Sequence, residues 1–502
     1  MNFLGIDVGT GGSRAVLIDE NGNIAASETV EHIPFATPEI GWAEQDPQDW
    51  WRASAEAIRK ILANKNAGNI AAIGLSGQMH GTVLLDENDK VLRPALIWCD
   101  QRTGKQCNEL TEKIGKERLI ELVSNPALTN FTLPKMLWVR ENETEIWDKV
   151  KTVLLPKDYV RLCLTGEKAT DVADGSGTLL LDVQNRKWSG ELLSLLEIDA
   201  SILPKLYESQ EITGEVTAKC SGETGLEAGT PVVAGAGDNA AGAIGMGLTK
   251  VGAVGVTIGT SGVVFAVTDK PSIDLKGRIH TLCHAIPERW HVTGVTQAAG
   301  LSFKWFRDNF AKGESFDKLV RMAEEIPAGS DGVLWTPYLM GERTPHIDPD
   351  ARATLTGLSA KHTKAHIVRA ILEGVAFSLR DSLEIYKELG IPLESIRLGG
   401  GGAKSELWRQ IQADVFNQAV ETIEVEEGAA YGAALLAGVG AGNWKSVGEA
   451  CNLTIRIKQK IEPNEEDAKI LNHQYKFYGR IYSAFKNVNS ENQQNSLVQP
   501  EN

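Results

Sequence analysis

The sequence contains few cysteines, and none are spaced for a zinc ribbon or a disulfide framework. All six are isolated, and no CxxC pair occurs. His280, Cys283 and His284 lie close together in the sequence. Residues 278–286 alternate like a strand, however, which places Cys283 opposite the two histidines, and no fourth ligand lies nearby. Neither a disulfide-rich fold nor a zinc site is predicted.

Positive charge is in deficit. The 51 lysines and arginines are outnumbered by 66 aspartates and glutamates, which leaves a formal net charge of −15. A broad surface for nucleic acid or for an anionic membrane is therefore not expected. A nucleotide is still compatible with this charge, because backbone N–H groups, helix N-termini and a bound cation hold phosphates without net positive charge.

Long uninterrupted apolar segments are also missing. The N-terminus reaches Asp7 at once and has no basic region, so no signal peptide is predicted. The uncharged stretch 251–268 is broken by four glycines and three hydroxyl residues, and its β-branched residues favour two strands around a turn over a membrane span. We therefore expect a cytoplasmic enzyme.

The length and an internal repeat predict two domains. A chain of 502 residues is too long for one hydrophobic core. Residues 3–19 align without gaps on residues 253–269, and both segments place a Gly-Thr-x-Gly turn between two short apolar strands. We predict domains at residues 1–247 and 248–487. Residues 488–502 are polar and lack periodicity, so they are predicted to be disordered.

Capping residues mark the start of three predicted helices. Asp46 followed by Pro47 is typical of a helix N-terminus. Thr363 precedes an apolar repeat with a period of four residues that continues to about residue 389, before Gly390. Ser405 is predicted to cap a further helix.

Four glycine-rich turns follow predicted strands, at residues 9–12, 235–238, 259–262 and 399–402. Glycine allows the backbone to approach a phosphate closely and to point successive N–H groups at it. Each turn alone is better explained as a plain turn, but four of them, two in matching places in the repeat, favour phosphate binding. The sequence contains no GxxxxGK[ST] and no GxGxxG before a helix, so neither a P-loop nor a Rossmann site is favoured.

Two aspartates stand in apolar surroundings. Asp7 ends a strand just before the first Gly-Thr turn, where it would either cap the turn or hold Mg²⁺ through water. Asp238 is the only charge in residues 228–246. A lone carboxylate in such surroundings has a raised pKa and is suited to accept a proton, although a structural aspartate bonded to backbone N–H groups is the alternative. Met79 and His80 follow a strand and carry little weight alone.

Together these residues resemble the FGGY family of carbohydrate kinases over nearly the whole chain. Residues 353–358 and 366–373 fit the C-terminal signature of the family, and residues 135–138 fit its N-terminal signature. Residues 75–81 and 97–102 resemble the members that act on D-xylulose, although Cys99 stands where members often have asparagine. The resemblance implies an α/β fold of two actin-like (ribonuclease H-like) domains around a central cleft.

The resemblance also implies roles for particular residues. Asp238 would be the general base and Asp7 the second catalytic residue, with Asp7 holding Mg²⁺ through water. The predicted substrate-binding residues are Met79, His80, Asp100, Arg102, Asp238 and Asn239. The predicted ATP-binding residues are Gly9, Thr10, Gly11, Gly259, Thr260, Gly300, Gly400, Gly401, Gly402 and Ser405, the last standing where several relatives have asparagine.

The function implied is ATP-dependent phosphorylation of D-xylulose to D-xylulose 5-phosphate. Two alternatives stay open: an FGGY kinase for ribulose, gluconate or glycerol, and a non-kinase ATPase of the actin type. The expected partners are the sugar and MgATP, with no nucleic acid and no membrane. A homodimer is one candidate assembly, and the sequence leaves the oligomeric state open.

Overall fold

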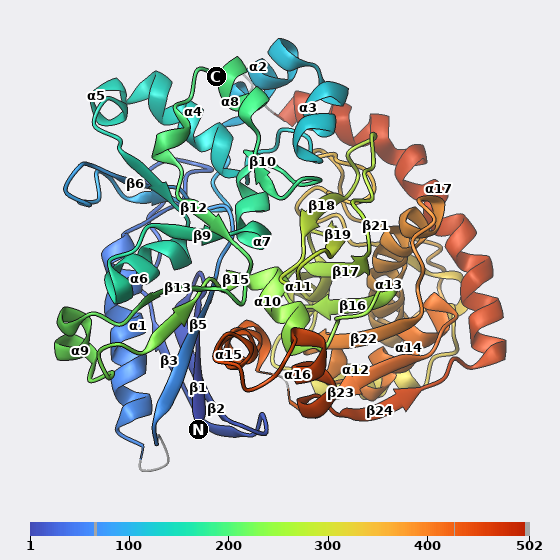
Figure 1. The fold of residues 1–502 in the computed structure, drawn as a ribbon. Coiled ribbons are helices and arrows are strands. Elements are labelled where there is room, and N and C mark those ends of the chain that lie inside the picture. Colours follow the sequence, from blue (N-terminus) through green and yellow to red (C-terminus); the bar gives the residue numbers. More distant parts are fainter. Residues whose placement is uncertain (65–67, 426, 497–502) are drawn as a thin grey trace.

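The first of two large sheets is built from the N-terminal half of the chain (Figure 1). A computed structural model describes residues 1–64, 68–425 and 427–496. The sheet has seven strands. Six run in the order β13 (Ile212–Glu215), β14 (Pro231–Val233), β5 (Ile70–Gly77), β1 (Asn2–Val8), β2 (Gly12–Asp19) and β3 (Ile24–Glu31), and β15 (Ala236–Gly237) pairs with β5.

The second large sheet repeats this plan. Its strands run in the order β18 (His280–Cys283), β19 (Trp290–Thr296), β17 (Gly262–Thr268), β16 (Ala253–Ile258), β22 (Ser395–Gly400), β23 (Val420–Ile423) and β24 (Ile457–Ile461). β16 pairs antiparallel with β17 and parallel with β22, as β1 does with β2 and β5. The predicted repeat is therefore confirmed, and stretch 251–268 forms two strands around a turn.

Helices cover the faces of both sheets. α1 (Pro47–Leu62) and α6 (Pro156–Thr165) contribute to the core of the first domain, and the carboxylate of Asp46 caps α1 by accepting from the N–H of Gln48 at 2.9 Å. α13 (Lys364–Glu388) and α14 (Glu406–Phe416) pack on the second sheet. α13 begins after Thr363, as predicted, with a capping box between Thr363 and His366.

Two small-residue helices join the domains. α15 (Gly428–Gly440) comes from the second half of the chain but packs on β1 and β5 of the first sheet. A Cβ on Gly74 of β5 would lie 1.9 Å from the carbonyl oxygen of Ala433, so only glycine permits this approach. α10 (Asp238–Gly245) in turn packs along α15, as Figure 1 shows. The division at residue 247 stays a prediction, because these helices cross between the two halves.

The remaining helices and strands complete the fold. The other helices are α2 (Gly104–Ile114), α3 (Lys116–Val123), α4 (Thr132–Asn142), α5 (Thr144–Trp147), α7 (Val172–Gly175), α8 (Gly190–Leu195), α9 (Ala218–Thr224), α11 (Ala299–Phe310), α12 (Phe316–Glu324), α16 (Val447–Thr454) and α17 (Glu465–Ser496). Small two-stranded sheets pair β4 (Glu44–Gln45) with β7 (Ala95–Leu96), β6 (Val83–Leu85) with β8 (Thr152–Leu154), β9 (Ala169–Asp171) with β12 (Lys205–Tyr207), β10 (Leu181–Asp182) with β11 (Lys187–Trp188), and β20 (Leu334–Thr336) with β21 (Thr354–Thr356).

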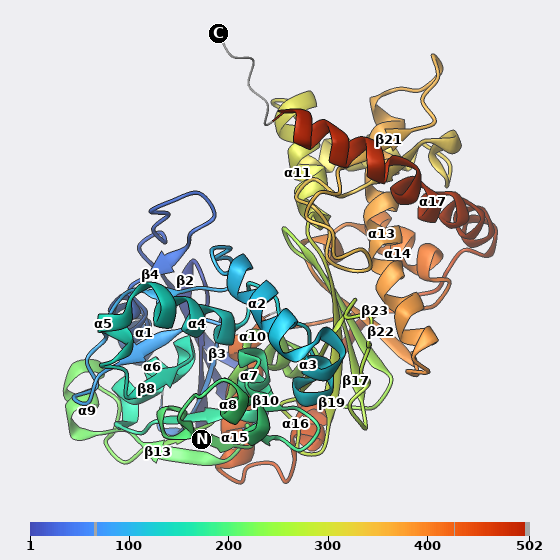
Figure 2. The ribbon, with the colours of Figure 1, turned by 90° about the horizontal axis from the view of Figure 1, so that it is seen from above.

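The tail prediction is corrected for residues 488–496, which continue helix α17 (Figure 2). Leu471 and Tyr478 anchor α17 in the core of the second domain. Extending an existing helix needs no new nucleation, so a polar segment can continue α17 although it would not form a helix alone. Residues 497–502 lie outside the described residues. No helix in the described part of the chain is long and apolar enough to span a bilayer.

Candidate active site

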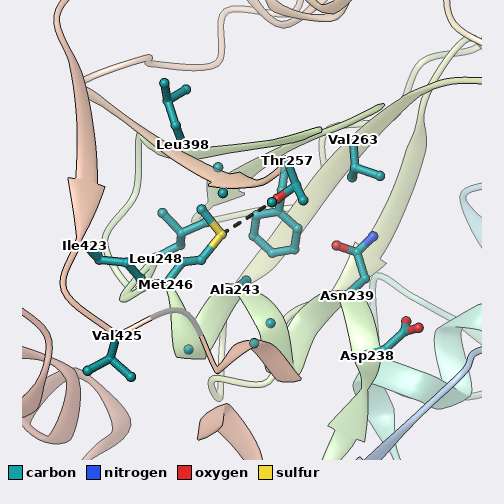
Figure 3. Close-up of a pocket in the computed structure, with 17 residues that line it drawn as sticks. Asp238, Asn239, Ala243, Met246, Leu248, Thr257, Val263, Leu398, Ile423 and Val425 are labelled. Carbon is teal, nitrogen blue, oxygen red and sulfur yellow. Dashed lines mark hydrogen bonds between the residues drawn. The ribbon is translucent and has the colours of Figure 1, made fainter. Parts of the chain in front are cut away.

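A cavity of about 370 Å³ lies between α10 and the second sheet (Figure 3). Gly242, Ala243 and Gly245 form its wall on α10, and these small residues leave the space open. Asp238 and Asn239 lie at one end, and Ile423 and Val425 lie at the other (Figure 3). The cavity therefore has an apolar interior with two polar side chains at one end, which is the usual composition of a small-molecule site.

Asp238 is the first residue of α10, directly after β15. Burial, together with the negative charge of Asp7, raises the pKa of its carboxyl to about 7, and the backbone N–H of Asn239 opposes both effects. A carboxyl group with a pKa near neutrality accepts and releases protons readily at physiological pH. The geometry is therefore suited to the predicted base, whose role stays a prediction.

Asp7 lies near the end of β1, opposite Ser76 of β5 and Arg14 of β2. Burial raises the pKa of Asp7 to about 6, although Ser76 and the charge of Arg14 oppose this rise. Its Oδ1 atom is buried and makes no hydrogen bond with any described residue. An unpartnered carboxylate oxygen suits Mg²⁺, which prefers oxygen ligands and few protein contacts.

The first Gly-Thr turn is tied to the predicted sugar loop. The N–H of Gly9 donates to the carbonyl of Gly12 at 3.0 Å and closes the turn. The Thr10 hydroxyl accepts from Nε1 of Trp98 at 2.9 Å and lies 3.4 Å from Oε1 of Gln78. Gln45 donates to the Thr10 carbonyl at 2.8 Å. These three partners were not predicted, because they become neighbours only in the folded chain.

The second Gly-Thr turn is held by the start of α11. The N–H of Gly259 donates to the carbonyl of Ser261 at 2.9 Å, and the N–H of Gly300 donates to the carbonyl of Gly259 at 2.9 Å. A Cβ on Gly300 would lie 2.3 Å from that carbonyl oxygen. Gly300 therefore supports the turn that carries Thr260, and a direct contact with nucleotide stays a prediction.

The glycine-rich turn at residues 399–402 begins within the last two residues of β22. Gly400 has φ +73° and lines the cavity with Gly399, so its backbone is exposed to a bound ligand. Gly402 packs on Ile258, where a Cβ would lie 2.7 Å from the side chain. The Ser405 hydroxyl accepts from the N–H of Trp408 at 3.2 Å and caps α14, as predicted. The adenosine contacts of Gly401, Gly402 and Ser405 stay predictions.

The predicted sugar loop follows β5. His80 has φ +69°, and burial lowers the pKa of its imidazole well below the usual value. The ring is therefore neutral, and its Nδ1 donates to the carbonyl of Gly177 at 2.6 Å. This bond leaves Nε2 as an acceptor for a ligand hydroxyl. Met79 is buried beside Gly177, where a Cβ would lie 2.9 Å from Cε of Met79.

Asp100 and Arg102 are paired with each other. Both side chains are buried, and the Arg102 guanidinium donates to both oxygens of Asp100, with Nε at 3.0 Å from each. The guanidinium also lies over the ring of Trp42, 3.6 Å from its centroid. Asp100 accepts from the N–H of Ala43 at 2.7 Å. Direct contact of either residue with sugar stays a prediction.

A buried charge cluster lies behind the sugar loop. Nζ of Lys157 is 2.6 Å from Asp158, 2.7 Å from Asp171 and 3.5 Å from Asp174, and all four side chains are fully buried. A Cβ on Gly237, next to Asp238, would lie 2.9 Å from Oδ1 of Asp174. The cluster thus supports the turn that carries the predicted base. Its sequence signal was the pair of aspartates in the otherwise uncharged segment 169–181.

Comparisons with known proteins agree with this geometry. Residues 2–245 match the N-terminal domain and residues 254–441 the C-terminal domain of the FGGY family of carbohydrate kinases. The chain belongs to this family. The relatives found include a xylulose kinase of Bacillus subtilis (strain 168), 41% identical over 97% of this chain and 98% of the relative. A gluconokinase of the same organism is 33% identical over 93% of each chain.

A solved structure shows the same architecture. The ligand-bound xylulose kinase from Lactobacillus acidophilus superposes with a TM-score of 0.92 at 28% identity, covering 97% of this chain and 98% of that one. The predicted α/β fold of two actin-like domains is confirmed. This FGGY protein is a carbohydrate kinase.

Proposed function

We propose that this kinase transfers the γ-phosphoryl group of ATP to the C5 hydroxyl of D-xylulose, with Asp238 as the general base. Relatives named as xylulose kinases cover nearly the whole chain and support the choice of sugar. The observation that carries the mechanism is the position of Asp238. It lies at the polar end of the cavity, close enough to Asp7 for their charges to interact, with a pKa of about 7.

The proton and the phosphoryl group move in one balanced step. The Asp238 carboxylate takes the proton of the sugar hydroxyl, whose oxygen forms a bond to the γ-phosphorus. The bond between this phosphorus and the oxygen bridging it to the β-phosphate breaks, and ADP leaves with the electron pair. Asp238 is half-buried, so it is open to a ligand while its surroundings keep its proton affinity high.

The glycine turns are assigned to the phosphates and the adenosine. The N–H groups of Gly9 and Gly259 close their turns, so the N–H groups that follow them in each turn are the ones assigned to the β- and γ-phosphates. Gly400 lines the cavity where the nucleoside would lie. Asp7 would hold Mg²⁺ through its unpartnered oxygen. When bound, the ion would neutralise negative charge on the phosphate oxygens.

A sugar panel tests the proposed substrate. Purified protein is given MgATP with D-xylulose, D-ribulose, L-ribulose, L-xylulose, gluconate or glycerol, and ADP release is followed. The highest kcat/KM is expected for D-xylulose, with the product identified as the 5-phosphate by ³¹P and ¹³C NMR. A higher kcat/KM for gluconate or glycerol would refute the substrate, and the 33% identical gluconokinase makes gluconate the most informative competitor.

A further inference from the structure

Two side chains of the second domain face the predicted sugar loop of the first. The ring of Phe131 stands between His80 and His280, with centroid distances of 5.1 Å and 5.5 Å and nearly perpendicular planes. His280 begins β18 of the second sheet. Its Nδ1 atom is buried and makes no hydrogen bond with any described residue. A polar atom of the second domain is therefore unpartnered at the wall of the sugar loop.

Arg343 lies beside this histidine in a loop that is held firmly. Its neighbour Glu342 accepts from the hydroxyl of Thr296 at 2.5 Å and from the N–H of Gln297 at 2.9 Å. Its other neighbour, Thr344, donates from its hydroxyl to the carbonyl of Arg278 at 2.8 Å. Arg278 is two residues before His280, so these bonds fix the backbone of Arg343 next to the start of β18.

The guanidinium of Arg343 has no partner among the described residues, none of which forms an ion pair or a hydrogen bond with it. Burial lowers the pKa of this side chain. Its charge contributes to lowering the pKa values of His80, Lys135 and His280, so it lies within electrostatic range of these three groups. A half-buried cation without a partner in the described residues is explained when a ligand supplies the acceptors.

A residue of the first domain already holds the backbone of the predicted sugar loop. Lys135 is fully buried, and its Nζ donates to the carbonyl of His80 at 3.0 Å and to the carbonyl of Asn130 at 2.5 Å. The N–H groups of Lys135 therefore hold the loop backbone. The N–H groups of Arg343 are not used in this way and are available to another acceptor. By contrast, the charges that act on Asp238 and Asp7 are those of Asp7 and Arg14. The charge of Arg343 therefore acts on His80 and is not among the charges that act on the proposed base.

We propose that Arg343 and His280 are the second-domain half of the sugar site and bind the end of the sugar that is remote from the hydroxyl to be phosphorylated. The inference rests on the proposed function. The ligand class is a polyhydroxyl chain with oxygen acceptors, such as the carbonyl and C1 hydroxyl of a ketose, which a planar guanidinium with five N–H donors fits. A sugar held from both domains would draw them together and so favour nucleotide binding.

Arg343→Met and Arg343→Lys test this proposal, with Arg321→Met on the exposed face of α12 as the matched control. The wild type's best sugar from the panel is used, so an error in the proposed substrate does not affect the outcome. For Arg343→Met, the KM for sugar should rise about ten- to a hundredfold, with kcat changed much less. Arg343→Lys should recover part of the loss, and Arg321→Met should behave as wild type.

Calorimetry supplies a second readout. In wild type, the sugar should tighten binding of a non-hydrolysable ATP analogue, and in Arg343→Met this coupling should fall towards a factor of one while analogue affinity without sugar stays unchanged. Unchanged KM and coupling would overturn the proposal, as would a large loss of kcat at constant KM. If Arg343→Met does not fold, His280→Asn decides by the same two measurements.

Discussion

Replacing Asp238 with asparagine removes the proposed base while keeping the volume of the side chain. The carboxyl has a pKa of about 7. About nine in ten molecules therefore carry the base form at pH 8, and only about one in eleven at pH 6. In wild type, kcat/KM for sugar should therefore fall as the pH is lowered through a midpoint near 7. On the acid side the decrease should approach tenfold per pH unit.

Asp238→Asn should lower kcat by about 10²–10⁴-fold, the range that general base catalysis supplies. The acid limb of kcat/KM should disappear with the carboxyl, and affinity for ATP should change little. Steady-state kinetics between about pH 5.5 and about pH 9, a range that covers the acid limb, measures both effects. A variant that keeps more than about a tenth of kcat, or that keeps the acid limb, would refute the assignment.

The same substitution has a predictable effect on stability. Because burial raises the pKa of Asp238 from 3.8 to about 7, the folded state binds the proton more tightly than the unfolded state, and wild-type stability falls as pH rises through this interval. This difference in pKa corresponds to a loss of at most about 4 kcal/mol in the free energy of unfolding at pH 8. The loss is smaller than this limit because the side chain is partly exposed. Asp238→Asn should therefore melt no lower than wild type at pH 8, and a large drop would indicate a structural carboxylate.

Three further substitutions test neighbouring features. Asp7→Asn should lower kcat/KM, and raised Mg²⁺ should restore part of the loss, whereas an unchanged response to Mg²⁺ would contradict its role. Gly300→Ala places a Cβ 2.3 Å from the Gly259 carbonyl, so kcat/KM for ATP should fall about 10²-fold, and wild-type kinetics would refute this. Lys157→Met removes the cation paired with Asp171 and Asp174 and leaves Asp158 with Arg161 alone, so it should lower the free energy of unfolding in urea by about 3–5 kcal/mol, a loss that an unchanged midpoint would exclude.

The parts of the fold that follow local rules could be predicted from the sequence. Asp46, Thr363 and Ser405 each begin a helix where a capping side chain precedes an apolar repeat. The Gly-Thr turns at residues 9–12 and 259–262 join paired strands, because the repeat encodes the same hairpin twice. In both cases the information lies within a few residues of the feature, so no tertiary contact has to be known.

The features that were missed depend on contacts between distant segments. The placement of α15 on β1 and β5 joins residues more than 350 positions apart, and no local pattern identifies a helix that crosses to the other domain. Lys157 gains Asp171 and Asp174 as partners only when β9 and α7 fold against α6. The helical end of α17 was missed for another reason, since composition describes an isolated segment and not the extension of an anchored helix.

The crossing of α15 has a consequence for synthesis on the ribosome. The strands β1, β2 and β5 are complete by residue 77, but the helix that covers one face of their sheet ends at Gly440. At about 5–20 residues per second, more than 350 further residues take roughly 20–70 s to translate. During that interval Phe3, Val16 and Ala72 lack part of their final cover. The N-terminal half is therefore expected to need chaperone protection until the chain is nearly complete, and to aggregate when it is expressed alone.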